Sequence, residues 1–197
     1  MSIDPRTYTY PNALLKDRTI MITGASDGIG RALAFETARL GAQVVLHGRN
    51  SAKLEKVYDQ IDAMDGTLRP SIVVLDLASA NAENYTMLAN SINDEFGKLD
   101  GLVHNAAIIG DRFSIEQFDA VVWQRVMHVN VTASFALTQV LLPILHQSND
   151  ASVIFTSSSV GRIGRAHWGA YAVSKFAIEG LSQVLADEHP HEKLRSN

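Results

Sequence analysis

Five short apolar runs, separated by longer stretches of helical pattern, constrain the fold more than any other feature of this sequence. Each run is continuous rather than alternating, as in strands that are covered on both faces. Strands that alternate with helices favour right-handed crossovers and therefore a parallel sheet. The pattern predicts an α/β domain, a doubly wound parallel sheet flanked by helices. The runs are Ile20–Ile22, Val44–Leu46, Ile72–Leu75, Leu102–Val103 and Val153–Phe155.

The stretches between these runs set the size of the domain. The chain has 197 residues, 46% of them hydrophobic, which is enough for one α/β domain rather than two. We expect residues 18–197 to form this domain and residues 1–17 to be an N-terminal arm. Helices are expected over about Ile29–Leu40, Ala52–Met64, Asn84–Phe96, Ser114–Leu145 and Gly169–Glu188, with Pro190 stopping the last.

The composition excludes several classes of function. A net charge of −4 argues against a nucleic-acid partner, which would require a basic face. The absence of cysteine excludes disulfides and thiolate chemistry. No apolar run reaches the ~18 residues of a membrane span, and the N-terminus lacks the core of a signal peptide. We therefore expect a cytoplasmic protein with no membrane partner and no metal site, and we interpret His189 and His191 as surface residues.

A glycine-rich segment, Thr23–Gly30, joins the first apolar run to the first helix. Glycine lets the chain turn sharply and lets a diphosphate approach the backbone, where the free N–H groups of the helix start bind it. The strand–turn–helix context favours a dinucleotide loop over the alternative, a merely tight turn. The residues of this loop expected to bind a cofactor are Gly24, Ser26, Asp27, Gly28, Ile29 and Gly30.

Tyr171 and Lys175 lie four residues apart in the last predicted helix, so they share one helix face. An ammonium group beside a phenol favours the phenolate, which suits acid/base chemistry. A tyrosine and a lysine at this spacing are also common on plain helix surfaces. The pair therefore indicates catalysis only in combination with the motifs around it.

Together with these motifs, the chain resembles the short-chain dehydrogenase/reductase family over about residues 15–197. That resemblance implies a Rossmann-type fold. Four further patches occur in the family's order and spacing: Asp76-Leu77, Asn105-Ala106-Ala107 (usually Asn-Ala-Gly), Asn130, and Ser157-Ser158-Ser159. The stretches Thr23–Gly30, Gly48–Asn50, Phe155–Gly161 and Gly169–Phe176 look especially like the YciK-type branch of bacterial oxidoreductases.

The resemblance implies roles for these residues. Tyr171 would be the catalytic acid/base and Lys175 would stabilise its phenolate. Ser158 would hydrogen-bond the substrate oxygen, with Ser157 and Ser159 pointing elsewhere if the strand stays regular. Asn130 would anchor a proton-relay water near the lysine; the alternative is a local backbone contact. Cofactor contacts are also implied for Asp76, Leu77, Asn105 and Ala106, and for Tyr171 and Lys175 in addition to their catalytic roles. A capping or turn role is the alternative for Asp76 and Asn105.

The end of the second apolar run bears on the choice of cofactor. An acidic residue there would bind the ribose 2′-hydroxyl of NAD(H), but the sequence has Gly48 followed by Arg49. A guanidinium suits a 2′-phosphate in charge and shape, so we expect NADP(H) to be preferred. Asp27, where many NADP(H)-preferring relatives carry a cation, argues the other way and keeps NAD(H) open.

The reaction implied is hydride transfer between nicotinamide and a small carbonyl or alcohol substrate. Arg162, Arg165, His167 and Trp168 are expected to border the substrate pocket. Arg165 and His167 could favour an anionic substrate or could be solvated rim residues. The rival hypothesis is a non-catalytic nucleotide-binding or assembly module that lacks a substrate lid.

Family members continue past the Tyr/Lys helix with two more strands, a Pro-Gly turn and a substrate lid. Here Leu194–Asn197 resembles the start of the sixth strand, so we expect the fold to be truncated before the last two strands and the fifth strand to be an exposed edge. The family also implies a homodimer or homotetramer. The apolar residues that could form its interface, or the core, are Phe135, Leu137, Leu141, Phe176, Ile178, Leu181 and Leu185.

Overall fold

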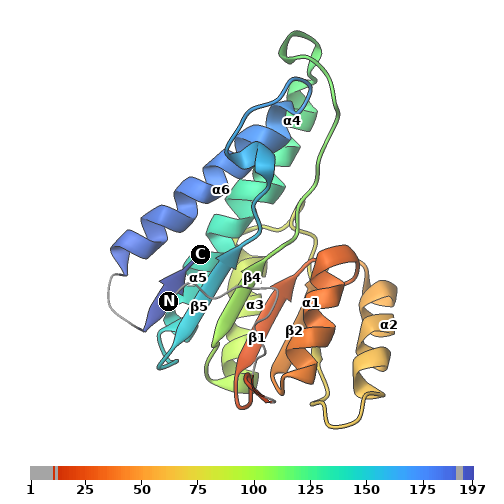
Figure 1. Ribbon diagram of the computed structural model, residues 1–197, viewed down its shortest axis with the longest axis vertical. Coiled ribbons are helices and arrows are strands. Elements are labelled where there is room, and N and C mark those ends of the chain that lie inside the picture. The colour runs from red at the N-terminus through yellow and green to blue at the C-terminus, as the bar shows by residue number, and fades with distance from the viewer. Residues whose placement is uncertain (1–10, 12, 190–192) are drawn as a thin grey trace.

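The computed structural model describes residues 11, 13–189 and 193–197 (Figure 1). In this part of the chain six parallel strands form one sheet in the order β3-β2-β1-β4-β5-β6. Most of the N-terminal arm, Pro190 and His191 lie outside the described residues. The strands are β1 Thr19–Thr23, β2 Gln43–Gly48, β3 Ser71–Val74, β4 Gly101–His104, β5 Ala151–Phe155 and β6 Leu194–Ser196.

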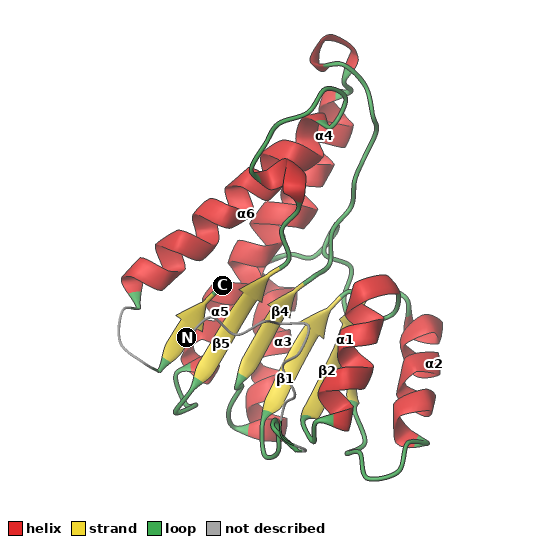
Figure 2. Ribbon diagram, in the orientation of Figure 1, coloured by secondary structure: helices red, strands yellow, loops and turns green. Residues whose placement is uncertain are grey.

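Helices cover both faces of the sheet, as Figure 2 shows for α1 in front of the strands and α3 behind them. One apolar cluster joins α1 and α2 to the first face, and a larger one joins α3, α5 and α6 to the second. The predicted doubly wound architecture is confirmed. The helices are α1 Gly28–Arg39, α2 Ser51–Asp62, α3 Ala82–Phe96, α4 Ala120–Met127, α5 Ala133–Leu145 and α6 Gly169–Glu188.

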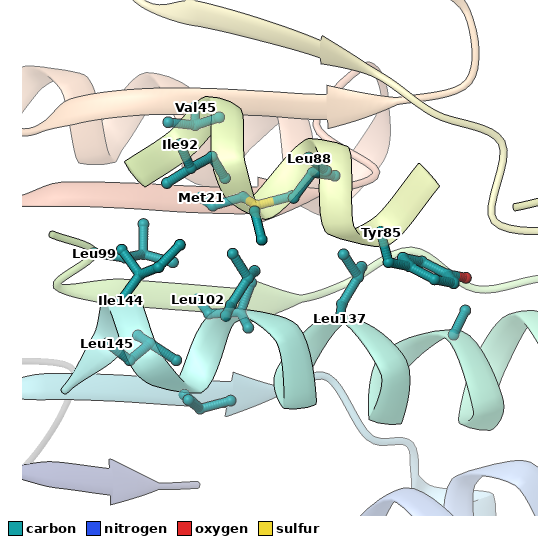
Figure 3. Packing of buried hydrophobic residues seen from close by; sticks show 14 of the residues in the cluster. Met21, Val45, Tyr85, Leu88, Ile92, Leu99, Leu102, Leu137, Ile144 and Leu145 are labelled. Atoms are coloured by element: carbon teal, nitrogen blue, oxygen red, sulfur yellow. The ribbon is translucent and has the colours of Figure 1, made fainter. Parts of the chain in front are cut away.

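The larger cluster forms because α3 and α5 each carry an apolar stripe against one face of the strands. Met21 and Leu102 project from β1 and β4 toward Ile92 of α3 and Leu137 of α5, and all four side chains are almost completely buried (Figure 3). Burial of each such side chain stabilises the fold by about 1.5–3 kcal/mol. The cluster fixes the strand ends that carry the site.

The predicted long helix over Ser114–Leu145 is interrupted. A 3₁₀ turn at Ile115–Gln117 precedes α4, and a π-helical turn over His128–Thr132 separates α4 from α5. The helical stretch Ala120–Leu145 is apolar and long enough, by composition alone, to cross a membrane, but half of its most apolar window is buried inside the domain. It is packed as a core element, and single π turns of this kind often mark functional sites.

The predicted edge at the fifth strand is wrong. β6 pairs with β5 in parallel register, with Ala151 beside Leu194 and Val153 beside Ser196. The backbone of Asn197 extends the pairing, since its N–H bonds Val153 O at 3.0 Å. Leu194 is buried, so an apolar contact anchors this three-residue strand, and the predicted start of a sixth strand is confirmed.

The interface candidates divide between core and surface. Leu137, Leu141, Ile178 and Leu185 belong to the core cluster, and Leu181 packs against it. Phe135 and Phe176 remain about half exposed, at 48% and 46%. Only these two of the seven remain available to a second copy of the chain.

Candidate active site

The glycine-rich segment turns from β1 into α1 at the carboxyl edge of the sheet. Gly24 and Gly28 have φ of +68° and +51°, a conformation that side chains disfavour. At Gly30 the constraint is space, because a Cβ would lie 2.3 Å from Gly24 O and 2.5 Å from Asn105 Nδ2. The turn therefore packs against the end of β4 with no room for a side chain.

Thr23 and Asn105 hold this turn to β4. Thr23 Oγ1 accepts hydrogen bonds from the N–H groups of Asn105 and Ala106 at 2.9 and 3.0 Å and donates to Val103 O at 3.2 Å. Asn105 Nδ2 donates to Thr23 O at 3.1 Å. These hydrogen bonds hold the ends of β1 and β4 together at the switch point of the sheet, where ligands bind in doubly wound folds.

A crevice of about 500 Å³ opens at this switch point. It brings together most of the predicted cofactor residues: Gly24, Ser26, Asp27, Gly28, Arg49, Asp76, Leu77, Asn105 and Ala106. Gly30 is buried beneath the turn, and Ile29 is 64% exposed on α1 and does not line the crevice. Asp76 and Leu77 follow β3 rather than ending it, since β3 stops at Val74.

The crevice also contains residues that sequence reasoning missed. Lys53 lies in the first turn of α2, four residues after Arg49, and Arg125 reaches the crevice from α4. Arg49 and the N-cap Asn50 precede the helix, so no helix-face spacing indicated Lys53. His47 lines the crevice at 1% exposure, and neither ring nitrogen has a hydrogen-bond partner within the described residues.

Asp27, the residue that argued for NAD(H), is neutralised by its neighbours. Its Oδ1 accepts from Gly28 N at 2.8 Å as the N-cap of α1, and its Oδ2 pairs with Lys53 Nζ at 3.2 Å. The backbone N–H of Gly28 and then the Lys53 ammonium hold the pKa of Asp27 below its usual range. Arg49 is exposed and forms no ion pair with any described carboxylate. An anionic group bound at the end of β2 would face two cations, Arg49 and Lys53, and one carboxylate, Asp27.

On α6, Lys175 is turned inward against Tyr171. Its side chain is only 4% exposed, Nζ lies 5.6 Å from the Tyr171 ring centroid, and Nζ donates to Thr156 O at 2.6 Å. Burial lowers the pKa of Lys175 to about 8. Among the described residues the Thr156 carbonyl is its one hydrogen-bond partner, so burial of this ammonium costs stability.

Asn130 sits in the π turn and braces two segments of the site. Its Oδ1 accepts from Ile108 N at 2.8 Å, while Nδ2 donates to Ile108 O at 2.9 Å and to Ser174 Oγ at 3.0 Å. Ser174 Oγ in turn donates to Tyr171 O at 2.7 Å. Both amide hydrogens are therefore used, so a relay water would be held through a different atom of this region.

Ser158 follows β5 and caps a 3₁₀ turn, η3 (Ser159–Gly161), accepting from Val160 N at 3.4 Å. The strand has ended at Phe155, so the three serines do not follow strand alternation. Ser158 is half-buried and Ser159 is exposed. Gly161 lies against Lys175, and a Cβ at Gly161 would be 2.9 Å from Lys175 Cβ, so this turn packs directly on α6.

The predicted residues thus form two adjacent groups. The crevice ends at Ile108 and Val129, next to the Asn130 brace, and Tyr171, Lys175 and Ser158 do not line it. The brace links the groups because Ile108 is in the first and Ser174 is in α6. Among the described residues no cluster of three metal-ligating side chains occurs.

Comparisons with known proteins agree with this geometry. The family described as short chain dehydrogenase matches residues 18–197. The chain is 52% identical over 190 residues to the uncharacterized oxidoreductase YciK of Escherichia coli (strain K12), covering 96% of this chain and 75% of that protein.

Solved structures are equally close. A short chain dehydrogenase from Salmonella enterica subsp. enterica serovar Typhi str. CT18 has a TM-score of 0.94 and 49% identity, covering 96% of this chain and 78% of that one. A protein from Shigella flexneri 2a str. 301, complexed with NADP, has a TM-score of 0.92 and 51% identity, covering 95% and 77%. The matched residues run from β1 through β6 and include both groups of site residues. The chain therefore belongs to the short-chain dehydrogenase family.

Proposed function

We propose that this protein is an NADP(H)-dependent oxidoreductase acting on a small carbonyl or alcohol substrate. The observation that carries the proposal is the buried ammonium of Lys175 beside Tyr171, next to a crevice built for a dinucleotide. A bound nicotinamide would supply or accept the hydride. A module that only binds nucleotides has no use for a buried lysine of this kind, which favours the enzyme over that alternative.

The proton chemistry is divided between Tyr171 and Lys175 of α6 and Ser158, which caps η3. Tyr171 gives a proton to the substrate oxygen during reduction and takes it back during oxidation. Lys175 stabilises the phenolate form by its charge, and Ser158 donates a hydrogen bond to the same substrate oxygen. Asn130 keeps Tyr171 and Ile108 in register through Ser174.

Two observations support NADP(H) as the preferred cofactor. Arg49 and Lys53 supply two cations at the end of β2, and Asp27 is already paired. The Shigella flexneri relative is complexed with NADP. Tighter binding of NADH than NADPH in a titration would contradict this choice.

The experiment that tests the function is oxidation of NADPH with a panel of aldehydes and ketones. We expect turnover of at least one member and loss of roughly 10²–10⁴-fold in kcat/KM for Tyr171→Phe. NADPH binding should persist in the variant. Normal NADPH binding with no turnover of any carbonyl would favour the non-catalytic module instead.

We further propose that the protein works in the cytoplasm as a homodimer or homotetramer. Phe135 and Phe176 expose large apolar surfaces on α5 and α6 that a second copy could cover. The burial of Ala120–Leu145 supports a core role over a membrane role for that segment. Sedimentation as a monomer would refute the oligomer.

A further inference from the structure

A long segment between β4 and α4, residues 105–119, extends to the start of the catalytic helix (Figure 1). Phe118 packs against Gly169 so closely that a Cβ there would lie 2.9 Å from Phe118 Cδ2. The turn that enters α6 has φ of +67° at His167 and +21° at Gly169. The segment and the turn are therefore fitted to each other beside Tyr171.

At this contact three side chains form a row. The Arg112 guanidinium carbon lies 4.1 Å from the centroid of the Trp168 ring, and the Trp168 ring centroid lies 5.8 Å from that of Tyr171. Stacking on an indole holds a guanidinium in place while leaving its N–H groups at the rim free to donate. The row places a fixed cation one aromatic ring away from the catalytic phenol.

The charge of Arg112 is not neutralised within the described residues. Its neighbour Asp111 forms no ion pair with it, whereas Arg162 pairs with Glu179, with Nε 3.4 Å from Oε1. Arg165, in the turn before α6, is also exposed and without a carboxylate partner in the described ranges. A guanidinium that is positioned but unpaired is typical of a site that receives an anion.

We propose that the substrate carries a carboxylate, bound by Arg112, in addition to the carbonyl or alcohol group that reacts at Tyr171. This inference rests on the proposed function and names the substrate class of the same site. Arg112 acts as a specificity residue that contacts the substrate, and Trp168 positions its guanidinium. A carboxylate suits the planar, two-point donor geometry of arginine.

A matched pair of aldehydes tests the inference: 4-carboxybenzaldehyde and its neutral methyl ester, methyl 4-formylbenzoate. With NADPH, the unmodified protein should show a higher kcat/KM for the acid. Arg112→Gln should lower kcat/KM for the acid roughly 10- to 100-fold, mainly through KM, and leave the ester unchanged. Arg112→Lys should restore part of the loss. Arg69→Gln, at a distant arginine paired with Asp62, is the control and should change neither substrate.

Two results would overturn the inference. One is equal kcat/KM for acid and ester in the unmodified protein, and the other is an equal loss on both substrates in Arg112→Gln, which would indicate a purely structural role. Binding of both aldehydes to the NADPH-loaded protein separates the two proposals. Arg112-dependent binding of the acid without turnover would retain the anion site and reject the reductase. Turnover of both aldehydes without discrimination would retain the reductase and reject the anion site. The anion site is also rejected if the acid neither binds nor is turned over.

Discussion

At the scale of single residues, the site depends on polar groups that are buried against their solvation preference. Lys175 and His47 are 4% and 1% exposed, and burial is the first cause of the lowered pKa of each. Such groups cost stability and persist where they serve a function. For Lys175 we therefore predict that a substitution lowers activity without lowering stability. For His47 we predict that the stability of the fold depends on pH.

Lys175→Met should separate activity from stability. The substitution removes the charge that favours the Tyr171 phenolate, so kcat/KM should fall roughly 10²–10⁴-fold. Methionine has an unbranched side chain of similar length, and the substitution removes a buried charge. The melting temperature at pH 7 should therefore be unchanged or higher. Steady-state kinetics and thermal unfolding measure the two effects. A large drop in melting temperature with retained activity would show that the lysine is structural.

His47 predicts acid sensitivity of the fold. Burial lowers the pKa of His47 to about 4, and burial together with the His47 charge lowers that of His104 to about 3. In the unfolded chain the histidine pKa is near 6.5. Between this value and the lower pKa of the folded state, the unfolded chain binds more protons than the folded protein. The stability from the neutral rings is therefore present above pH 6.5 and is lost as the pH falls toward 4.

In urea unfolding, each buried histidine should cost about 2 kcal/mol at pH 5 relative to pH 8. His47→Leu removes one of these groups, so the variant should lose less stability over the same range than the unmodified protein. An identical loss in both proteins would contradict the burial of a neutral ring at position 47.

At the scale of elements, the site is made where turns and helix interruptions meet. The π turn His128–Thr132 carries Asn130, which joins the β4 loop to α6 through Ile108 and Ser174. The glycine turn is pressed against Asn105 with no space for a side chain. Both devices position backbone and side chains at the carboxyl ends of β1 and β4.

Gly30→Ala should damage the cofactor crevice. The new methyl group would overlap Gly24 O and Asn105 Nδ2, so the turn must shift away from β4. We expect a stability loss of about 1–3 kcal/mol and weaker NADPH binding, measured by thermal unfolding and fluorescence titration. Gly164→Ala, where an added Cβ meets nothing within 4 Å, is the control and should change neither. Unchanged NADPH affinity in Gly30→Ala would mean that the turn does not approach the cofactor.

At the scale of the whole molecule, the alternation of apolar runs predicted the sheet and the motif order predicted most of the crevice. Helix α6 runs over Gly169–Glu188 as predicted. The interruption at His128–Thr132 escaped detection because its apolar pattern continues through the π turn. Arg112 escaped it because it belongs to no motif and meets Trp168 only in the folded chain. The start of β6 was indicated by resemblance, but its pairing with β5 was not, because three residues carry too little pattern to show that they complete a strand.

The most direct test of the account follows the hydride itself. NADPH labelled with deuterium at the transferable C4 position is incubated with the protein and an accepted aldehyde, and the alcohol is analysed by mass spectrometry and NMR. The account predicts one deuterium at the carbinol carbon, formed at a rate that falls roughly 10²–10⁴-fold in Tyr171→Phe. Alcohol without deuterium, or labelled alcohol formed equally fast by Tyr171→Phe, would contradict it.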